Sequence, residues 1–449
     1  MHRGYRGYRG YRGGRPSTDR SKASTSEAPP LGGIIERITR ENLSGDDIHA
    51  EIENVKFVAS YNWVSSSSPK IIIPGQPPRW TPLKGTSSLP QDSGDYYRDI
   101  NAASYPKHPL EPAIISVMKM HPRPIPVNIV ACASSIGNLL RFVRGVDIDR
   151  RFRILVEKIG DTVHLVRREN SPDEKIENIR GFGHTFPEAY TTWDSAVKRS
   201  KSHQRIISYQ FGGFDFLVRF EGDGYFGPSS PETSVKSSSK SSDESDLNQI
   251  QDLGVSDSPV NTTCKLDVSK GGDVVPQSSI FDLKTRSVNT RQKDHLGEQL
   301  PRLWISQITQ LLLAYHKGGV FEEKDIEIMD IKSDMDKWQD SNQPSLNRLA
   351  ALFHLIIDSV RSSKDGKLEI VCSDGGSLEI RKQLPDAGVI LSEPVKKQWK
   401  AWLDSKHEKA HQSDSECWEE FMATLSDSDE QSDYAACDAE CGYCGKCMY

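Results

Sequence analysis

Two short apolar segments of this 449-residue sequence each contain a pair of charged side chains two residues apart. Side chains two apart project from the same face of a strand, so the segment FLVRFEGD predicts that Glu221 and Asp223 lie side by side. By the same rule the segment FDLKTR places Asp282 beside Lys284. If the two strands are neighbours, three acids and a lysine gather in one patch.

Such a patch suits a divalent cation. Clustered carboxylates raise each other's pKa unless a positive charge neutralises them, and oxygen ligands of this kind prefer Mg²⁺ or Mn²⁺. These ions activate water and stabilise a leaving oxygen, while a neighbouring lysine can hold a phosphate. The pattern therefore predicts metal-assisted phosphodiester hydrolysis. The alternative is an ordinary solvated strand face, with Glu221 and Asp223 paired to Arg219 or Arg205.

Strands are expected on both sides of this patch. Apolar runs rich in β-branched and aromatic residues, separated by Gly and Pro turns, indicate strands along the N-terminal half of the chain. They cover Val55–Trp63, Lys70–Ile73, Ile125–Cys132, Phe152–Glu157, Thr162–Arg167, His203–Tyr209 and Phe216–Glu221, followed by the SIFDLKTR segment, Leu368–Cys372 and Ser377–Arg381.

Helices are expected mainly in the C-terminal half, where apolar residues recur every three or four positions. Asn138–Val143 is either a helix or a buried segment, and Glu393–Asp404 is a last helix. One long helix has the face Leu300, Leu303, Trp304, Ile308, Leu311, Leu312 and Tyr315, and a second runs from Leu346 to Val360. Strands followed by helices predict an α+β fold, a mixed sheet flanked by helices.

Composition divides the chain into a folded body and polar additions. Hydrophobic residues make up 36% of the chain, which is low for a protein folded throughout. We expect a disordered Arg/Gly/Tyr-rich arm at 1–33 and a folded domain at 34–405. A disordered insertion at 227–278 interrupts that domain, and an acidic, Ser-rich tail with a Cys-rich tip follows at 406–449. Long insertions of this kind add little entropic cost to folding.

The acidic motifs resemble those of a known enzyme group. E-x-D on one strand and D/E-hydrophobic-K on the next resemble the PD-(D/E)XK nuclease superfamily. More narrowly they are similar to the eukaryotic decapping exoribonuclease (DXO-like) family, which removes incomplete or non-standard RNA 5′ caps and digests RNA. That family has a preceding G-hydrophobic-x-x-x-E motif, matched here by Gly183-His-Thr-Phe-Pro-Glu188. A following helix with Trp and Gln resembles Trp304-Ile-Ser-Gln307, and Arg141 is a loose counterpart of an upstream family arginine.

Three residues depart from the family pattern. His184 replaces a hydrophobic residue, Pro187 directly precedes the glutamate, and Asp282 is shorter than the usual glutamate. Aspartate is common at the last position in the wider superfamily, so metal binding is retained as an expectation. The changes around Glu188 bear on the narrower assignment and on cap specificity.

The resemblance implies a role for each matched residue. Lys284 would assist the nucleophile and Glu221 would act through a bound water, while Arg141 and Gln307 would bind substrate. The metal, Mg²⁺ or Mn²⁺, would be held by Glu188, Asp223, Asp282 and the main-chain carbonyl of Leu283. The implied fold is a PD-(D/E)XK-like nuclease core spanning 34–405, and the implied partner is RNA.

Two other functions stay open. A catalytically degenerate protein with the same fold could bind RNA or act as a scaffold. Fungal sequences that resemble this one are often labelled geranylgeranyl pyrophosphate synthetase, a class of all-helical enzymes with two D-D-x-x-D motifs. Here Asp46-Asp47 lacks the rest of that motif, and the expected strands disagree with it. Lone histidines (His184, His203, His316) are expected at the surface or in the core, and Trp63, Trp80 and Trp193 are expected to pack rather than stack on bases.

The two ends of the chain carry patterns of their own. The opening Arg-Gly-Tyr repeats could pair with phosphates and stack on bases, or form a tail with no specific role. At the other end, four thiols at Cys437, Cys441, Cys444 and Cys447 could hold Zn²⁺ or an iron–sulfur cluster, or remain free. Without an apolar signal or spanning segment, we expect a nuclear or cytoplasmic protein rather than a secreted or transmembrane one. Partner proteins for the tails stay open.

Overall fold

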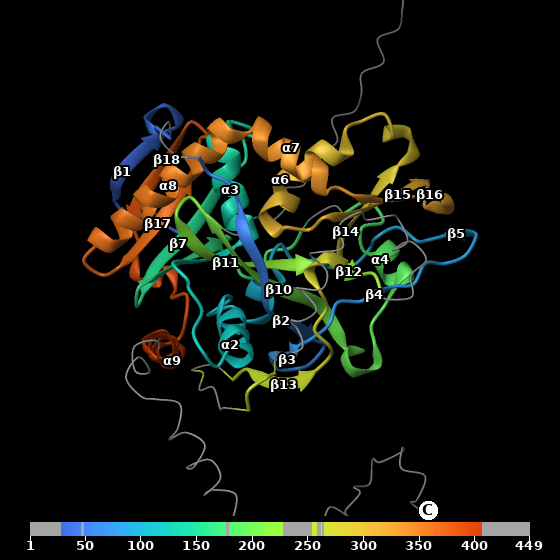
Figure 1. Cartoon of the computed structure of the whole chain (residues 1–449), viewed down its shortest axis with the longest axis horizontal. Helices are drawn as coiled ribbons and strands as arrows, with labels where there is room; N and C mark the ends of the chain where they lie inside the picture. The colour runs from blue at the N-terminus through green and yellow to red at the C-terminus, as the bar shows by residue number, and fades with distance from the viewer. Residues whose placement is uncertain are drawn as a thin grey trace, which may run out of the picture. The chain divides into compact units, whose positions relative to one another are not determined.

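The computed structural model describes residues 28–45, 49–176, 179–227, 254–257, 262 and 265–405. Within this part of the chain, eleven strands form one sheet and seven form another, with helices packed around them (Figure 1). The first sheet has the order β1-β18-β17-β7-β8-β6-β11-β10-β2-β3-β13, and the second the order β5-β16-β15-β14-β12-β4-β9. Both sheets mix parallel and antiparallel pairs. The predicted α+β class is confirmed.

The elements have the following bounds. In the eleven-stranded sheet they are β1 Ile34–Thr39, β2 Glu53–Val64, β3 Lys70–Pro74, β6 Ile129–Cys132, β7 Phe152–Ile159, β8 Thr162–Arg168, β10 Ser200–Phe211, β11 Phe214–Gly222, β13 Asp267–Gly271, β17 Lys367–Cys372 and β18 Ser377–Lys382. In the seven-stranded sheet they are β4 Arg79–Trp80, β5 Thr86–Ser88, β9 Thr191–Thr192, β12 Gly224–Tyr225, β14 Ile280–Ser287, β15 Gln310–Lys317 and β16 Val320–Asp330. The α-helices are α1 Ile100–Ser104, α2 Glu111–Met120, α3 Ala133–Arg144, α4 Thr185–Tyr190, α6 His295–Ser306, α7 Lys332–Ser341, α8 Gln343–Ser362 and α9 Glu393–Asp404.

Strand β11 lies at the centre of the larger sheet and is buried on both faces. It pairs with β10 in antiparallel fashion and with β6 in parallel fashion. Because successive side chains point to opposite faces, Phe216 and Val218 enter the core under α3, α6 and α8, whereas Leu217 enters the core under α2 and α9. This double burial fixes the register of the strand, and with it the side on which Glu221 emerges.

The two acid-bearing strands do not pair with each other, contrary to the expectation that they are neighbours in one sheet. Strand β11 ends at Gly222 in the larger sheet, and the chain crosses to the smaller sheet at Asp223. The next two residues form β12, which pairs antiparallel with β14 through Gly224 and Phe281. The acidic motifs therefore approach each other at the junction between two sheets.

The long helix predicted through Tyr315 is wrong in its second half. Helix α6 ends at Ser306, where Gln307 adopts a left-handed conformation with φ of 50°. The following LLLAY run forms β15, which pairs parallel with β14 and is buried throughout. A continuous apolar run fits a strand covered on both faces as well as it fits a helix, so periodicity alone misassigned it.

The predicted disordered insertion is too long at its C-terminal end. Asp267–Gly271 form β13, which pairs parallel with β3, and Val275 is buried in the core. Residues 228–253, the arm at 1–27 and the tail at 406–449 with its four cysteines lie outside the described residues. The sheets of the described domain differ from the all-helical fold of a prenyl diphosphate synthase.

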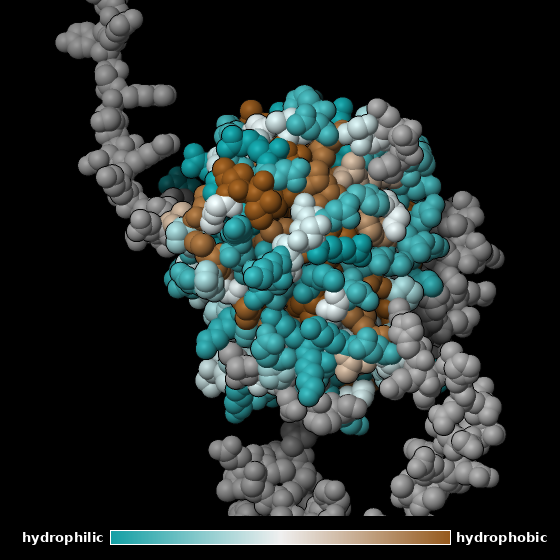
Figure 2. Space-filling model, turned by 90° about the vertical axis from the view of Figure 1, so that its left-hand side faces the viewer, coloured by the Kyte–Doolittle hydropathy of each residue, from teal (hydrophilic) through white to brown (hydrophobic). Residues whose placement is uncertain are grey.

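The surface around the edge strand β1 carries apolar side chains. Leu31, Ile34 and Ile35 are exposed there, and the corresponding side of the molecule mixes hydrophobic and hydrophilic areas (Figure 2). None of the described helices is long and apolar enough to span a membrane.

Candidate functional site

A cavity of about 860 Å³ opens beside the end of β11. Residues of α3, α4 and α6 contribute to its walls together with β11. Of the predicted catalytic, metal-binding and substrate-binding residues, Arg141, Glu188, Glu221 and Asp223 line it. Asp282, Leu283, Lys284 and Gln307 do not line it, so the structure places them behind or beside the cavity wall.

Asp223 connects the cavity to strand β14. Its Oδ2 accepts a hydrogen bond of 2.8 Å from the backbone N–H of Leu283 and lies 3.4 Å from the Lys284 Nζ. The Lys284 ammonium also donates to the Leu283 carbonyl at 2.8 Å and pairs with Asp282 Oδ1 at 2.9 Å. Three of the predicted ligand groups, two carboxylates and one carbonyl, thus surround one positive charge.

Asp282 is buried, with 1% of its side chain exposed, and is held by two cations. Besides Lys284, the guanidinium of Arg302 approaches its Oδ1 to 2.5 Å. Burial alone would raise the pKa of Asp282, but Lys284 and Arg302 hold it below its ordinary value. Among the described residues, the polar partners of this carboxylate are these two cations.

Glu221 meets the opposite environment. Its carboxylate is open to the cavity, yet protein atoms around the recess exclude much of the bulk water. This desolvation, together with the negative charges of Asp223 and Asp99, raises the pKa of Glu221 to about 7. A hydrogen bond with Gln204, its cross-strand partner on β10, opposes the shift. Glu221 can therefore exchange a proton near neutral pH.

Glu188 reaches the cavity from the short helix α4, and Asp92 positions that helix. Buried Asp92 accepts hydrogen bonds from the backbone N–H groups of His184 and Thr185 at the start of α4. The ring of His184 stacks on Tyr96, with centroids 3.4 Å apart, and lines the cavity. Pro187 fits because the first turn of a helix needs no intrahelical N–H donor. The two departures from the family pattern are thus accommodated locally.

The cavity lining also carries a set of basic side chains, here called the basic wall. Its cationic residues are Arg98, Arg141, Arg144, Arg150, Arg167, Lys201, Arg219 and Arg302. Arg141 donates to Asn138 and to the Arg150 carbonyl, and Arg219 lies 3.8 Å from the Asp99 carboxylate. Arg302 was missed in the sequence because no motif marks it, whereas Arg219 was noted only as a partner that could neutralise Glu221.

Gly224 allows β12 and β14 to come together. A Cβ atom at this position would lie 2.3 Å from the ring of Phe281 and 2.9 Å from the Pro78 carbonyl oxygen. Only glycine permits this approach, and the approach brings Asp223 against the backbone of Leu283. The last glycine of the EGDG sequence therefore has a structural role in assembling the site.

The remaining candidates lie apart from the cavity. Gln307 caps α6, and its side-chain amide donates to the Trp304 carbonyl, so its predicted role in substrate binding has no geometric support here. His203 is buried and bonded to Asn62, and His316 packs against Phe182. Trp63 and Trp80 are buried, as expected for packing residues, and Trp193 is half-buried.

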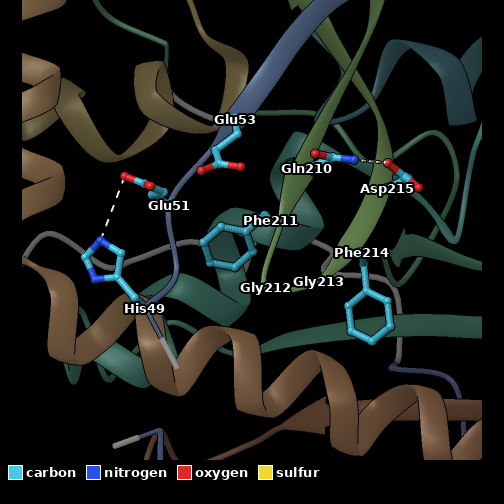
Figure 3. Close-up of a pocket in the computed structure, with 9 residues that line it drawn as sticks. All are labelled: His49, Glu51, Glu53, Gln210, Phe211, Gly212, Gly213, Phe214 and Asp215. Atoms are coloured by element: carbon cyan, nitrogen blue, oxygen red, sulfur yellow. Dashed lines mark hydrogen bonds and ion pairs between the residues drawn. The ribbon is translucent and has the colours of Figure 1, made fainter. Parts of the chain in front are cut away.

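A second, smaller cavity of about 260 Å³ lies at the far end of the β10–β11 pair, beside the Gly212-Gly213 turn (Figure 3). Its carboxylates have neutral or distant partners. Asp215 accepts a hydrogen bond from Gln210 at 3.0 Å, and Glu51 lies 3.9 Å from His49 (Figure 3). This cavity has no arginine or lysine among its lining residues.

The residues beside the larger cavity suit a divalent cation in their chemistry. Asp223, Asp282 and the Leu283 carbonyl are hard oxygen donors that already share one cation, the Lys284 ammonium. In the described part of the chain, however, no three His, Cys, Asp or Glu side chains are grouped closely enough to hold a metal. Glu188, Glu221 and Asp223 line the same cavity.

Comparison with known proteins identifies the fold. A protein-family model described as a domain of unknown function (DUF8563) matches residues 34–377. No curated protein matches this sequence. The crystal structure of Scheffersomyces stipitis Rai1 in complex with (3′-NADP)⁺ and calcium ion is similar, with a TM-score of 0.52 and 10% identity over 83% of this chain and 99% of that chain. S. pombe Rai1 in complex with 3′-FADP gives a TM-score of 0.50 and 10% identity over 78% and 99%.

These similarities bear on the architecture. Rai1 belongs to the decapping exonuclease family that the motifs resemble, so the predicted resemblance is confirmed for the fold. At 10% identity the similarity shows a shared fold and does not assign an activity to this chain.

Proposed function

This chain belongs to the family described as a domain of unknown function (DUF8563), and we propose that it is a metal-dependent phosphodiester hydrolase acting on RNA 5′ ends. The observation that carries the proposal is the convergence of Asp223, Asp282 and the Leu283 carbonyl on one cation, beside a cavity walled by arginines. The shared fold with Rai1, whose crystal structure contains (3′-NADP)⁺ and calcium ion, agrees with this assignment.

The basic wall would bind the phosphates of an RNA strand. Arginine guanidinium groups form paired hydrogen bonds with phosphate oxygens, and Arg98, Arg141 and Arg150 border the cavity. Contacts of this kind position a nucleic acid without reading its sequence. We therefore expect the strand to lie along this wall with its 5′ end directed at Asp223.

The acidic side would hold the metal and move the proton. Asp223, Asp282, the Leu283 carbonyl and Glu188 are the proposed ligands, and bound Mg²⁺ or Mn²⁺ would supply activation of water and neutralisation of phosphate charge. Glu221, with a pKa of about 7, can accept a proton from water in the cavity. Lys284 is held in place by Asp282 and Leu283, and its charge stabilises a negative phosphate group nearby.

The test is cleavage of RNA by the purified full chain in the presence of Mn²⁺. Labelled RNA with a 5′-monophosphate, a triphosphate or a cap serves as substrate, and released products are separated by size. We expect product from at least one 5′ end, and loss of product with Asp223→Asn. Asp215→Asn, which removes a carboxylate beside the smaller cavity, is the matched control and should retain cleavage.

A catalytically degenerate RNA-binding protein is the second candidate, and one observation favours it. The Arg302 guanidinium lies against Oδ1 of Asp282, the place that a metal bound by this carboxylate would take. Retention of RNA without any product, in Mn²⁺ and in Mg²⁺, would select this candidate over the hydrolase.

A further inference from the structure

Arg302 separates a buried carboxylate from the cavity. Asp282 is almost completely buried and does not line the cavity, whereas Arg302 does line it and has 45% of its side chain exposed. The Arg302 guanidinium lies 2.5 Å from Asp282 Oδ1. Of these two paired groups, only the guanidinium lines the cavity.

Arg302 and a divalent cation compete for the same carboxylate. Asp282 already has Lys284 at 2.9 Å, so Arg302 adds a second positive charge to a single negative one. A dication beside this pair would be repelled by the guanidinium, and the repulsion is strong where water is excluded.

The cavity offers Arg302 an alternative partner only when an anion is present. The guanidinium lies on a long, half-exposed side chain that borders a space of about 860 Å³. Phosphate is a preferred partner of arginine because two N–H groups can bond two oxygens at once. A phosphate in the cavity would compensate the guanidinium for the contact that it loses when it leaves Asp282.

We propose that Arg302 couples phosphate binding to metal binding at this site. Without phosphate, Arg302 covers Asp282 and weakens the binding of a divalent cation. With a phosphate in the cavity, Arg302 turns to the phosphate and exposes Asp282 to the metal. The coupling is reciprocal, so the metal also tightens phosphate binding. This inference rests on the proposed function, which assigns phosphate and metal to the same cavity.

The test measures Mn²⁺ binding by the electron paramagnetic resonance signal of free Mn²⁺, with and without saturating uridine 5′-monophosphate. In the wild-type full chain we expect the nucleotide to tighten Mn²⁺ binding about tenfold, within the usual range of coupling between sites. Arg302→Gln should bind Mn²⁺ about tenfold more tightly than wild type without nucleotide and gain little from it. Arg291→Gln removes a half-exposed guanidinium that pairs with Asp325 and Glu327 and does not line the cavity, so its affinity for Mn²⁺ alone should stay within about twofold of wild type.

Several results would overturn the coupling. They are equal Mn²⁺ affinities of wild type and Arg302→Gln without nucleotide, no effect of the nucleotide on wild type, and no Mn²⁺ binding by any variant. If Arg302→Gln does not fold, the wild-type measurement still decides, supported by Arg302→Lys, which should weaken the coupling. RNA cleavage is read separately. A protein with the expected coupling but no cleavage keeps this inference and removes the hydrolase proposal.

Discussion

The two ends of the β10–β11 strand pair carry similar side chains in different surroundings. At one end Gln204 faces Glu221 across the strands, and at the other Gln210 faces Asp215. The first end meets arginines, a lysine and a second sheet beside a large cavity. The second end is a glycine turn with a small cavity, where carboxylates bond to an amide or lie near a histidine (Figure 3).

The difference teaches that carboxylates alone do not make a site. The Asp215 carboxylate accepts a hydrogen bond from the Gln210 amide, and no arginine or lysine lines the cavity beside it. Glu221 also has a glutamine partner, Gln204, yet its pKa is raised because water is displaced and Asp223 and Asp99 lie nearby. The junction between two sheets creates the recess that leaves these charges close together and poorly solvated.

The largest effect that would separate the two ends is on catalysis. If the cavity is the hydrolytic site, Asp223→Ala removes a carboxylate that both holds Leu283 and faces the cavity, and we expect cleavage of RNA to fall about 100-fold or more. Asp215→Ala should leave the rate within about threefold of wild type. The measurement is kcat/KM on 5′-labelled RNA in Mn²⁺. Equal losses from both substitutions would contradict the distinction between the two ends.

Much of this architecture could be predicted from the sequence because the relevant signals are local. Alternation in FLVRFEGD and FDLKTR predicted strands and the faces of Glu221 and Asp282, and the helix from Leu346 to Val360 follows from its periodicity. The pairing of strands is not local. That the chain changes sheets at Asp223 depends on how β12 fits between β4 and β14, and no spacing rule reports it.

The site was predicted in part for the same reason. The acids were found because they belong to short motifs, although their roles stay proposals. Arg302 was not found because it lies twenty residues from Asp282 and reaches it only through the fold. Gln307 was singled out by a motif, yet its left-handed backbone turns it into a helix cap instead of a cavity residue. A long-range contact decided the case of Arg302, and the local backbone at the end of α6 decided that of Gln307.

A smaller effect concerns stability and compares glycines at the two ends. Gly224→Ala places a methyl group 2.3 Å from the Phe281 ring, and forcing β12 away from β14 should cost about 2–3 kcal/mol of unfolding free energy. Gly213→Ala meets no atom within 4 Å, and its φ of 83° should cost only about 1 kcal/mol. Urea denaturation at pH 7 measures both. A larger loss at Gly213 than at Gly224 would show that the close approach of the two strands is not what this glycine protects.

The smallest effect is the pH dependence of the charge at Glu221 in the metal-free protein. Folding raises its pKa from an ordinary value of 4.5 to about 7, so the folded state binds the proton more tightly than the unfolded state. The resulting stabilisation is complete below about pH 4.5 and is lost as pH rises through about 7. Glu221→Gln cannot lose it. The difference in unfolding free energy between the variant and wild type should therefore shift in favour of the variant as pH rises from 5.5 to 8.

The size of this gain is limited because the carboxylate is open to the cavity. After allowance for solvent screening we expect about 1 kcal/mol between the two pH values, measured by urea denaturation in the presence of EDTA. Asp215→Asn, measured in the same way, reports what removal of a carboxylate does at the turn end of the same strands. The same change in unfolding free energy for both variants between pH 5.5 and pH 8 would contradict the proposed difference between the two ends. The proximity of Glu221 to Asp223 would then have no measurable effect. If only Glu221→Gln gains stability with rising pH, the poorly solvated negative charge lies at the large cavity. A bound cation would neutralise that charge.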